Sequence, residues 1–157
     1  MTLVLTVLRA TPSLNDFANR YTAAPWKYRD TRRLWHRLVG EALLEARVAY
    51  REPLRWPRPP RDHVVVQVTR YAAAHQWLDP DNLTGGLKPV LDALKSHDVI
   101  ADDTAKAIDL VARQDVSPHR QPTRWTEIRL SLDPPSTWVQ RQDAEDEEDA
   151  FRARGGR

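Results

Sequence analysis

The stretch HVVVQVTRYAA, residues 63–73, is the strongest strand pattern in the sequence. β-Branched and aromatic residues dominate it, and such residues favour the pleated surface of a sheet. A helical pattern follows, because apolar residues recur at helical spacing at Leu87, Val90, Leu91 and Leu94. Pro89 must lie in the first turn of this helix, where a missing N–H is tolerated. The helix is therefore expected to span about ten residues and to begin near Gly85 or Gly86.

Four other segments have regular patterns. Strands are predicted at residues 3–8, 105–115 and 125–133, and a longer helix is predicted at residues 30–50. The apolar face of that helix is formed by Trp35, Leu38, Val39, Ala42, Leu43, Ala46 and Tyr50. The last two strands are expected to form a hairpin with residues 119–122 as its loop. Together these elements predict an α+β fold, with a mixed, largely antiparallel sheet of about four strands flanked by two main helices.

The composition indicates one folded domain. The chain has 157 residues, of which 41% are hydrophobic, enough for a single core. The domain is expected to span residues 1–135, whereas residues 136–157 are polar and acidic and predict a disordered tail. The proline-rich residues 53–60 predict a stiff, extended connector. The absence of cysteine excludes disulfides and thiolate zinc sites. The apolar run at residues 3–8 is too short for a signal segment or a membrane span, so we expect a cytoplasmic protein.

The net charge of +2 conceals an uneven distribution. Residues 143–149 contain six acids and no base, whereas residues 20–61 contain eleven Lys or Arg and four acids. A basic region of this kind suits a polyanion, but many solvated surfaces are also basic, so charge alone leaves both interpretations open. Within this region an arginine recurs every four residues, at Arg29, Arg33 and Arg37. These arginines either meet successive phosphates or form a solvated flank that Glu41 partly neutralises.

Two aspartates follow the strongest strand and flank a proline, at Asp79 and Asp81. Pro80 disfavours the helical region for the residue before it and fixes its own φ, so we expect an extended tripeptide. In an extended chain, residues two apart point to the same side, which would direct both carboxylates to one place. A hard divalent cation such as Mg²⁺ prefers oxygen ligands of this kind. By itself, however, an Asp-x-Asp pattern is more often a turn or a helix cap.

A third acid can reach the same place. A helix over residues 86–97 is about 17 Å long, and residues 98–103 can return by up to about 20 Å. Either Asp102 or Asp103 can therefore come back beside the first two aspartates. Lys88 lies in the first turn of the same helix. It either faces the carboxylates, where it would hold a phosphate or stabilise developing charge, or is a surface lysine.

The order of these features resembles that of the RusA-type crossover junction endodeoxyribonucleases. The resemblance is carried by DPDNL at residues 79–83, KPVLDAL at residues 88–94 and ADD at residues 101–103. A Pro-Ser-x-Asn element at residues 12–15, after the first strand, also matches. The likeness covers about residues 3–133, with the specific motifs confined to residues 79–103. It departs from the best-known member in the longer gap between Leu83 and the lysine.

The resemblance implies a function and a set of site residues. Asp79, Asp81 and Asp103 match the family's metal-binding aspartates, and Lys88 matches a lysine important for activity. Supporting roles are implied for Asn82 and Asp102. Enzymes of this family are Mg²⁺-dependent homodimers, with Mn²⁺ as a substitute. They bind four-way DNA junctions and nick two strands symmetrically.

The DNA-binding surface is expected to be the basic loop and helix, through Asn15, Arg20, Lys27, Arg29, Arg33 and Arg37. Tyr21 and Trp26 either stack on unpaired bases at the crossover or pack within the protein. Two other functions remain open at this point. One is a non-catalytic branched-DNA-binding protein of the same fold, and the other is a metal-dependent hydrolase of nucleotides or RNA.

Overall fold

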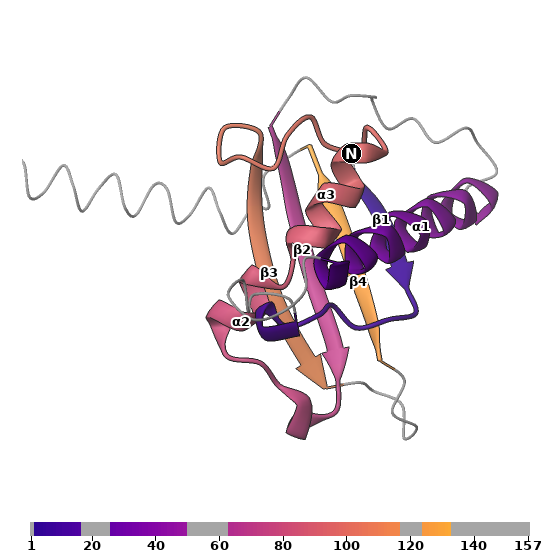
Figure 1. Cartoon of the computed structure of the whole chain (residues 1–157). Coiled ribbons are helices and arrows are strands. Elements are labelled where there is room, and N and C mark those ends of the chain that lie inside the picture. The colour runs from indigo at the N-terminus through magenta and orange to yellow at the C-terminus, as the bar shows by residue number, and fades with distance from the viewer. Residues whose placement is uncertain (1, 17–25, 50–62, 117–123, 133–157) are drawn as a thin grey trace, which may run out of the picture.

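The computed structural model describes residues 2–16, 26–49, 63–116 and 124–132. Its elements are β1 (Thr2–Val7), η1 (Leu14–Asp16), α1 (Trp26–Ala49), β2 (Val64–Ala72), η2 (Ala74–Gln76), α2 (Pro80–Gly85), α3 (Lys88–Ser96), β3 (Ile108–Val116) and β4 (Trp125–Ser131) (Figure 1). The predicted α+β architecture is confirmed, with a four-stranded mixed sheet and two main helices. The predicted connector at 53–60, the loop at 119–122 and the tail at 136–157 lie outside the described residues.

The strands are arranged in the order β1-β4-β2-β3. β4 pairs antiparallel with both β1 and β2, whereas β2 and β3 are parallel. The predicted hairpin between the last two strands is therefore wrong, because β2 lies between them. The burial pattern explains this order. Thr126, Ile128 and Leu130 of β4 are fully buried, as suits an inner strand, whereas β3 is mostly half-exposed and carries charged residues that suit an edge.

The core lies on one face of the sheet, where α1 and α3 cross it (Figure 1). Alternate residues of β1, β2 and β4 point into it, including Leu5, Val66 and Ile128. The helices contribute their apolar stripes, and the side chain of Trp35 in α1 is among the largest that are fully buried. Burial of each such large apolar side chain contributes about 1.5–3 kcal/mol. The predicted apolar faces of both helices are confirmed from Trp35 to Ala46 and from Leu87 to Leu94.

The connection from β2 to β3 positions the candidate site. Parallel neighbouring strands cannot be joined by a tight turn, so the chain crosses over the sheet through η2, α2 and α3. Just before α2, the side chain of Gln114 in β3 holds the main chain of Leu78. Its Oε1 accepts from the Leu78 N–H at 3.0 Å, and its Nε2 donates to the Leu78 carbonyl at 2.5 Å. The residue that precedes Asp79 is thereby fixed to the sheet.

The end of α3 is set by one residue with positive φ. Asp98 has a φ of 56°, which lies in the left-handed region that Asp tolerates better than most residues. The next amide, that of Val99, donates to the Leu94 carbonyl at 2.9 Å and closes the helix end. The chain then turns back toward the start of α3. Of the helices that the structure describes, none is long and apolar enough to cross a membrane.

Candidate active site

Asp79 caps the short helix α2. Its backbone is extended, with φ −66° and ψ 160°, but Pro80 begins the helix and Asp81 lies in its first turn. The predicted extended tripeptide is therefore wrong beyond Asp79, so extended-chain alternation does not align the two carboxylates. The reason is that the fixed φ of proline suits the first helical position as well as an extended chain. The residue before a proline is kept out of the helix and is free to cap it.

Asn82 holds the Asp79 carboxylate in place. The Asn82 N–H donates to Asp79 Oδ1 at 2.9 Å, and Asn82 Nδ2 donates to Asp79 Oδ2 at 2.6 Å. The pKa of Asp79 is lowered, first by the backbone hydrogen bond from Asn82 and then by its side chain. The supporting role of Asn82 stays a prediction, and these two hydrogen bonds are the contacts through which it would act. Asp81, by contrast, is exposed, and the described residues provide its carboxylate with no ion-pair partner.

The Pro-Ser-x-Asn element lies against the turn between α2 and α3. A Cβ on Gly86 would lie 2.0 Å from the carbonyl oxygen of Pro12, and one on Gly85 would lie 2.8 Å from the Leu14 side chain. Only glycine fits at Gly86, because the obstacle there is backbone. The extra residues in the gap before Lys88 thus form the surface on which residues 12–14 pack. Asn15 follows them in η1 and is exposed.

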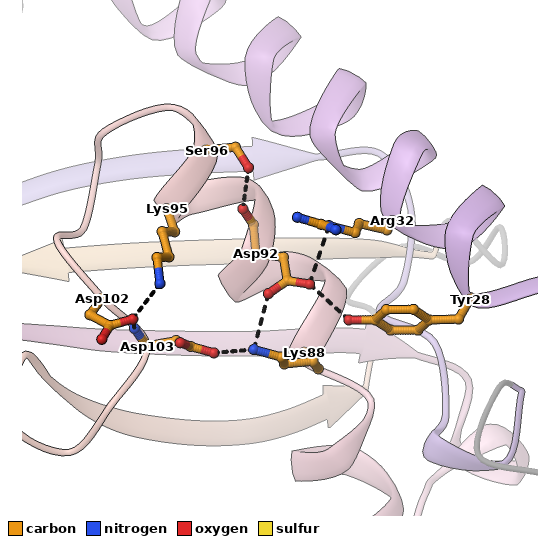
Figure 2. A network of polar contacts seen from close by, with 8 residues as sticks. All are labelled: Tyr28, Arg32, Lys88, Asp92, Lys95, Ser96, Asp102 and Asp103. Carbon is orange, nitrogen blue, oxygen red and sulfur yellow. Dashed lines mark hydrogen bonds and ion pairs between the residues drawn. The ribbon is translucent and has the colours of Figure 1, made fainter. Parts of the chain in front are cut away.

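Lys88 turns its amine toward carboxylates, although its side chain is 50% exposed. The Nζ atom contacts the Asp103 carboxylate and lies 3.0 Å from Asp92 Oδ1 (Figure 2). The predicted return of the chain after α3 therefore reaches the first turn of that helix. The hydrogen bond to Asp103 is the main reason that the pKa of Lys88 is raised above its ordinary value. Lys88 is therefore not a surface lysine that contacts only solvent.

The two acids of the ADD motif have different partners. Asp103 meets Lys88, whereas Asp102 Oδ1 lies 2.6 Å from Lys95 Nζ and accepts from the Asp103 N–H at 2.9 Å (Figure 2). The hydrogen bond from Lys95 lowers the pKa of Asp102. Lys95 thus holds Asp102 to one side, while Asp103 lies beside the lysine of the KPVLDAL motif.

Asp92 is the central acceptor of this network, and we did not single it out from the sequence. Its side chain is 14% exposed, and it lies between α3 and the start of α1 (Figure 2). Asp92 Oδ2 accepts from the Tyr28 hydroxyl at 2.8 Å and lies 3.4 Å from Arg32 Nε. Burial, followed by the hydrogen bond to Asp92, raises the pKa of Tyr28 to about 12. The available sequence signal is the spacing of four residues from Lys88, which puts both side chains on one helix face.

The three predicted metal ligands have the right donor chemistry. All are carboxylates, and hard divalent cations prefer such oxygen ligands. As the side chains lie, however, the described residues contain no group of three or more acids or histidines able to hold a metal ion. Asp79 is engaged by Asn82 and Asp103 by Lys88. Joint metal binding by Asp79, Asp81 and Asp103 therefore stays a prediction.

Of the predicted DNA-binding residues that the structure describes, Asn15 lies in η1 and the others lie on α1. Lys27, Arg29, Arg33 and Arg37 are all exposed, and Arg20 and Tyr21 lie outside the described residues. Two of the arginines have exposed acidic neighbours, since Arg33 lies 4.0 Å from Asp30 and Arg37 lies 3.9 Å from Glu41. Exposed pairs of this kind are weak and leave an arginine able to change partner.

The arginines near the start of α1 lie close to the Asp92 network. Arg29, Arg32 and Arg33 line a hollow of about 290 Å³ between α1 and α3, together with Asp92. Trp26, at the start of α1, is 52% exposed, and Lys27 Nζ lies 5.9 Å from its ring centroid. Trp26 is thus not buried as a packing residue, and its ring is accessible.

No protein-family model matches the chain, and no curated protein sequence matches it. The likeness to RusA-type enzymes therefore rests on the motif residues themselves.

Proposed function

We propose that the chain is a Mg²⁺-dependent, structure-specific DNA endonuclease of the RusA type. It resolves Holliday junctions or other branched DNA by paired, symmetric nicks. The observation that carries the proposal is the contact between Lys88 and Asp103. This contact joins two of the three motif segments, and only the two-residue link at Gly86 and Leu87 separates Lys88 from the helix that Asp79 caps.

In this proposal Asp79, Asp81 and Asp103 hold Mg²⁺, and Mn²⁺ substitutes for it. When bound, such an ion activates water and stabilises negative charge on phosphorus-bound oxygen. The chain's own residues prepare the donors. Asn82 fixes Asp79 and favours its charged form. Lys95 holds Asp102, so that Asp103 is the acid at the site.

In this proposal Lys88 supplies a positive charge beside Asp103. Asp92 holds its ammonium group, so the charge is oriented before substrate arrives. A preoriented cation near developing phosphate charge is worth far more than a mobile one in water. Lys88 can therefore turn from Asp103 toward a phosphate oxygen while Asp92 retains its other contact.

The DNA strands are proposed to follow the arginines of α1 and the exposed Asn15, which lies beside the α2–α3 turn. Phosphate contacts of this kind position the duplex and make binding salt-dependent. Symmetric cutting of two strands needs two equivalent sites, so we propose a homodimer as the active species. Its substrate would be chromosomal or other DNA in the cytoplasm.

A cleavage assay tests the proposal. Purified protein is incubated with a synthetic four-way junction, a linear duplex or single-stranded RNA, in Mg²⁺, Mn²⁺ or EDTA. Symmetric junction nicks are expected only with metal, and they should fall at least about 100-fold in Asp81→Asn. Asp98→Asn is the matched control, because it removes an exposed carboxylate from the nearby return loop and tolerates positive φ. Equal loss in both variants would contradict the role of Asp81.

The second candidate is a non-catalytic branched-DNA-binding protein of the same fold. It is favoured by the pairing of Asp103 with Lys88 and by the lack, among the described residues, of a preformed group of metal ligands. Tight junction binding without cleavage in either metal would establish this function and refute the nuclease. Cleavage of RNA in preference to the junction would instead indicate a ribonuclease.

A further inference from the structure

A cavity of about 670 Å³ lies where the ends of β1 and β2, the start of β4 and the helix α1 meet. Its volume falls in the range of about 300–1,000 Å³ that is usual for ligand pockets. Three arginines line it, Arg9, Arg70 and Arg124, against one acid, Asp16. The Asp16 carboxylate already accepts from the Ser13 N–H at 2.7 Å. The cavity lining therefore carries an excess of positive charge.

Arg70 is the unusual member of this lining, because it is only 6% exposed. Its Nε donates to the Thr11 carbonyl at 3.3 Å, and Nη1 donates to the Gln76 carbonyl at 2.9 Å. These bonds use two of the five N–H donors of a guanidinium. Among the described residues, no carboxylate forms an ion pair with Arg70. Burial and then the nearby charge of Arg124 lower the pKa of Arg70, and the charge of Asp16 opposes them only in part. A buried cation that forms no ion pair is costly unless an anion joins it.

Thr11 gives a second and independent indication. It is 2% exposed, it lines the same cavity, and its hydroxyl has no hydrogen-bond partner among the described residues. Buried hydroxyls are nearly always hydrogen-bonded, so a buried one without a partner calls for an explanation. A bound anion would accept from this hydroxyl and from the remaining guanidinium donors.

We propose that this cavity binds one phosphate group of a DNA strand, held by Arg70, Arg124 and the Thr11 hydroxyl. Guanidinium groups match the geometry of phosphate oxygens, which favours phosphate as the anion. The identity of the polymer rests on the proposed endonuclease function. Leu78 also lines the cavity and directly precedes Asp79. A phosphate bound here fixes the strand next to the candidate site, and its role is to set the register of the DNA.

The first test measures anion binding without metal or DNA. Thermal unfolding of the full chain is followed in increasing inorganic phosphate, against chloride at equal ionic strength. A ligand that binds only the folded state raises Tm, and the concentration dependence yields an apparent Kd. The variants are Arg124→Gln and Thr11→Val. The matched control is Arg113→Gln, which removes an exposed arginine of β3 that is not among the residues lining the cavity.

We expect phosphate to raise the Tm of the unaltered chain and of Arg113→Gln equally. The apparent Kd should weaken at least about tenfold in Arg124→Gln and about fivefold in Thr11→Val. In chloride, Thr11→Val should unfold at the same temperature as the unaltered chain or higher, because its hydroxyl has no partner to lose. Loss of binding is thereby separated from loss of folding. Equal phosphate shifts in all four proteins, or no shift in any, would overturn the proposal.

The second test uses a four-way junction in EDTA. In Arg124→Gln the slope of log affinity against log salt should fall by about one relative to Arg113→Gln. An unchanged slope would refute a DNA phosphate as the ligand. The two proposals fail separately. Phosphate binding at the cavity without cleavage in any metal supports the cavity and refutes the nuclease. Metal-dependent junction cleavage with equal phosphate shifts in all variants supports the nuclease and refutes phosphate binding at the cavity.

Discussion

Replacing Asp92 with alanine removes the acceptor that joins α3 to the start of α1. Three donors lose their contact with Asp92, namely the Tyr28 hydroxyl at 2.8 Å, Lys88 Nζ at 3.0 Å and Arg32 Nε at 3.4 Å. A hydrogen bond to a charged acceptor contributes about 1.5–3 kcal/mol when it is partly buried, as the bond from Tyr28 is. The lysine and arginine are half exposed, so solvent screening leaves each ion pair about 0.5 kcal/mol. We expect Asp92→Ala to lower the free energy of unfolding by about 2.5–4 kcal/mol.

Asp92→Asn separates the two contributions. The amide oxygen still accepts from Tyr28, but the bond to a neutral acceptor is weaker by about 1 kcal/mol. The two ion pairs with Lys88 and Arg32 are also lost, so the expected total loss is about 2 kcal/mol. Urea unfolding followed by tryptophan fluorescence measures both changes. The control is Asp30→Ala, which removes an exposed carboxylate 4.0 Å from Arg33 and should cost less than about 0.5 kcal/mol. The reasoning is refuted when Asp92→Ala costs no more than Asp30→Ala, or when the alanine and asparagine variants lose equal stability.

Three other variants probe different features. Gly86→Ala places a Cβ 2.0 Å from the Pro12 carbonyl oxygen, so it should lower the free energy of unfolding by at least about 1–3 kcal/mol. Urea unfolding measures this change, and an unchanged free energy of unfolding would contradict the packing at this turn. The pKa of Tyr28 is raised from 10.0 to about 12 in the folded chain. The protonated Tyr28 hydroxyl therefore contributes its full stabilisation below pH 10, where the unfolded tyrosine is also protonated. This stabilisation is lost as pH rises from about 10 through about 12. Tyr28→Phe should therefore flatten the fall in Tm over this window, and an identical fall would show that other groups cause it. Lys88→Gln should reduce metal-dependent junction cleavage about 100-fold or more. Lys106→Gln, which removes an exposed lysine that has no part in the proposed site, should change it by less than about threefold. Equal effects of the two variants on the nicking rate would remove Lys88 from the mechanism.

Local periodicity predicts the elements of this fold well. The apolar spacing from Leu87 to Leu94 marks the buried face of α3, and Pro89 locates its first turn. Strand order is different, because alternation reports which face of a strand is buried and not which strand lies beside it. β4 follows β3 in the chain yet pairs with β1 and β2. The hairpin prediction failed for that reason.

The candidate site was predictable in part. Chain length and helix length predicted that Asp102 or Asp103 returns beside Asp79 and Asp81. The structure shows that Asp103 returns to Lys88 in the first turn of α3, and its approach to the other two aspartates stays a prediction. The conformation at Asp79 and Asp81 was misjudged, because proline suits both an extended segment and the first position of a helix. Asp92 could not be singled out from the sequence. Its partner Tyr28 is far away in sequence, so the contact exists only once α1 packs on α3.

The place of β4 has a consequence for synthesis of the chain. β1 emerges first from the ribosome, but its only partner in the described sheet is formed by Trp125–Ser131, so that Leu5 meets Ile128. Until those residues emerge, β4 is missing from its place between β1 and β2 in the described sheet, and neither strand can pair with it. Unpaired strands of this kind are prone to pair with other chains. A nascent or truncated chain that stops before Trp125 is thus left with two apolar strands, β1 and β2, that lack the neighbour they share in the folded sheet.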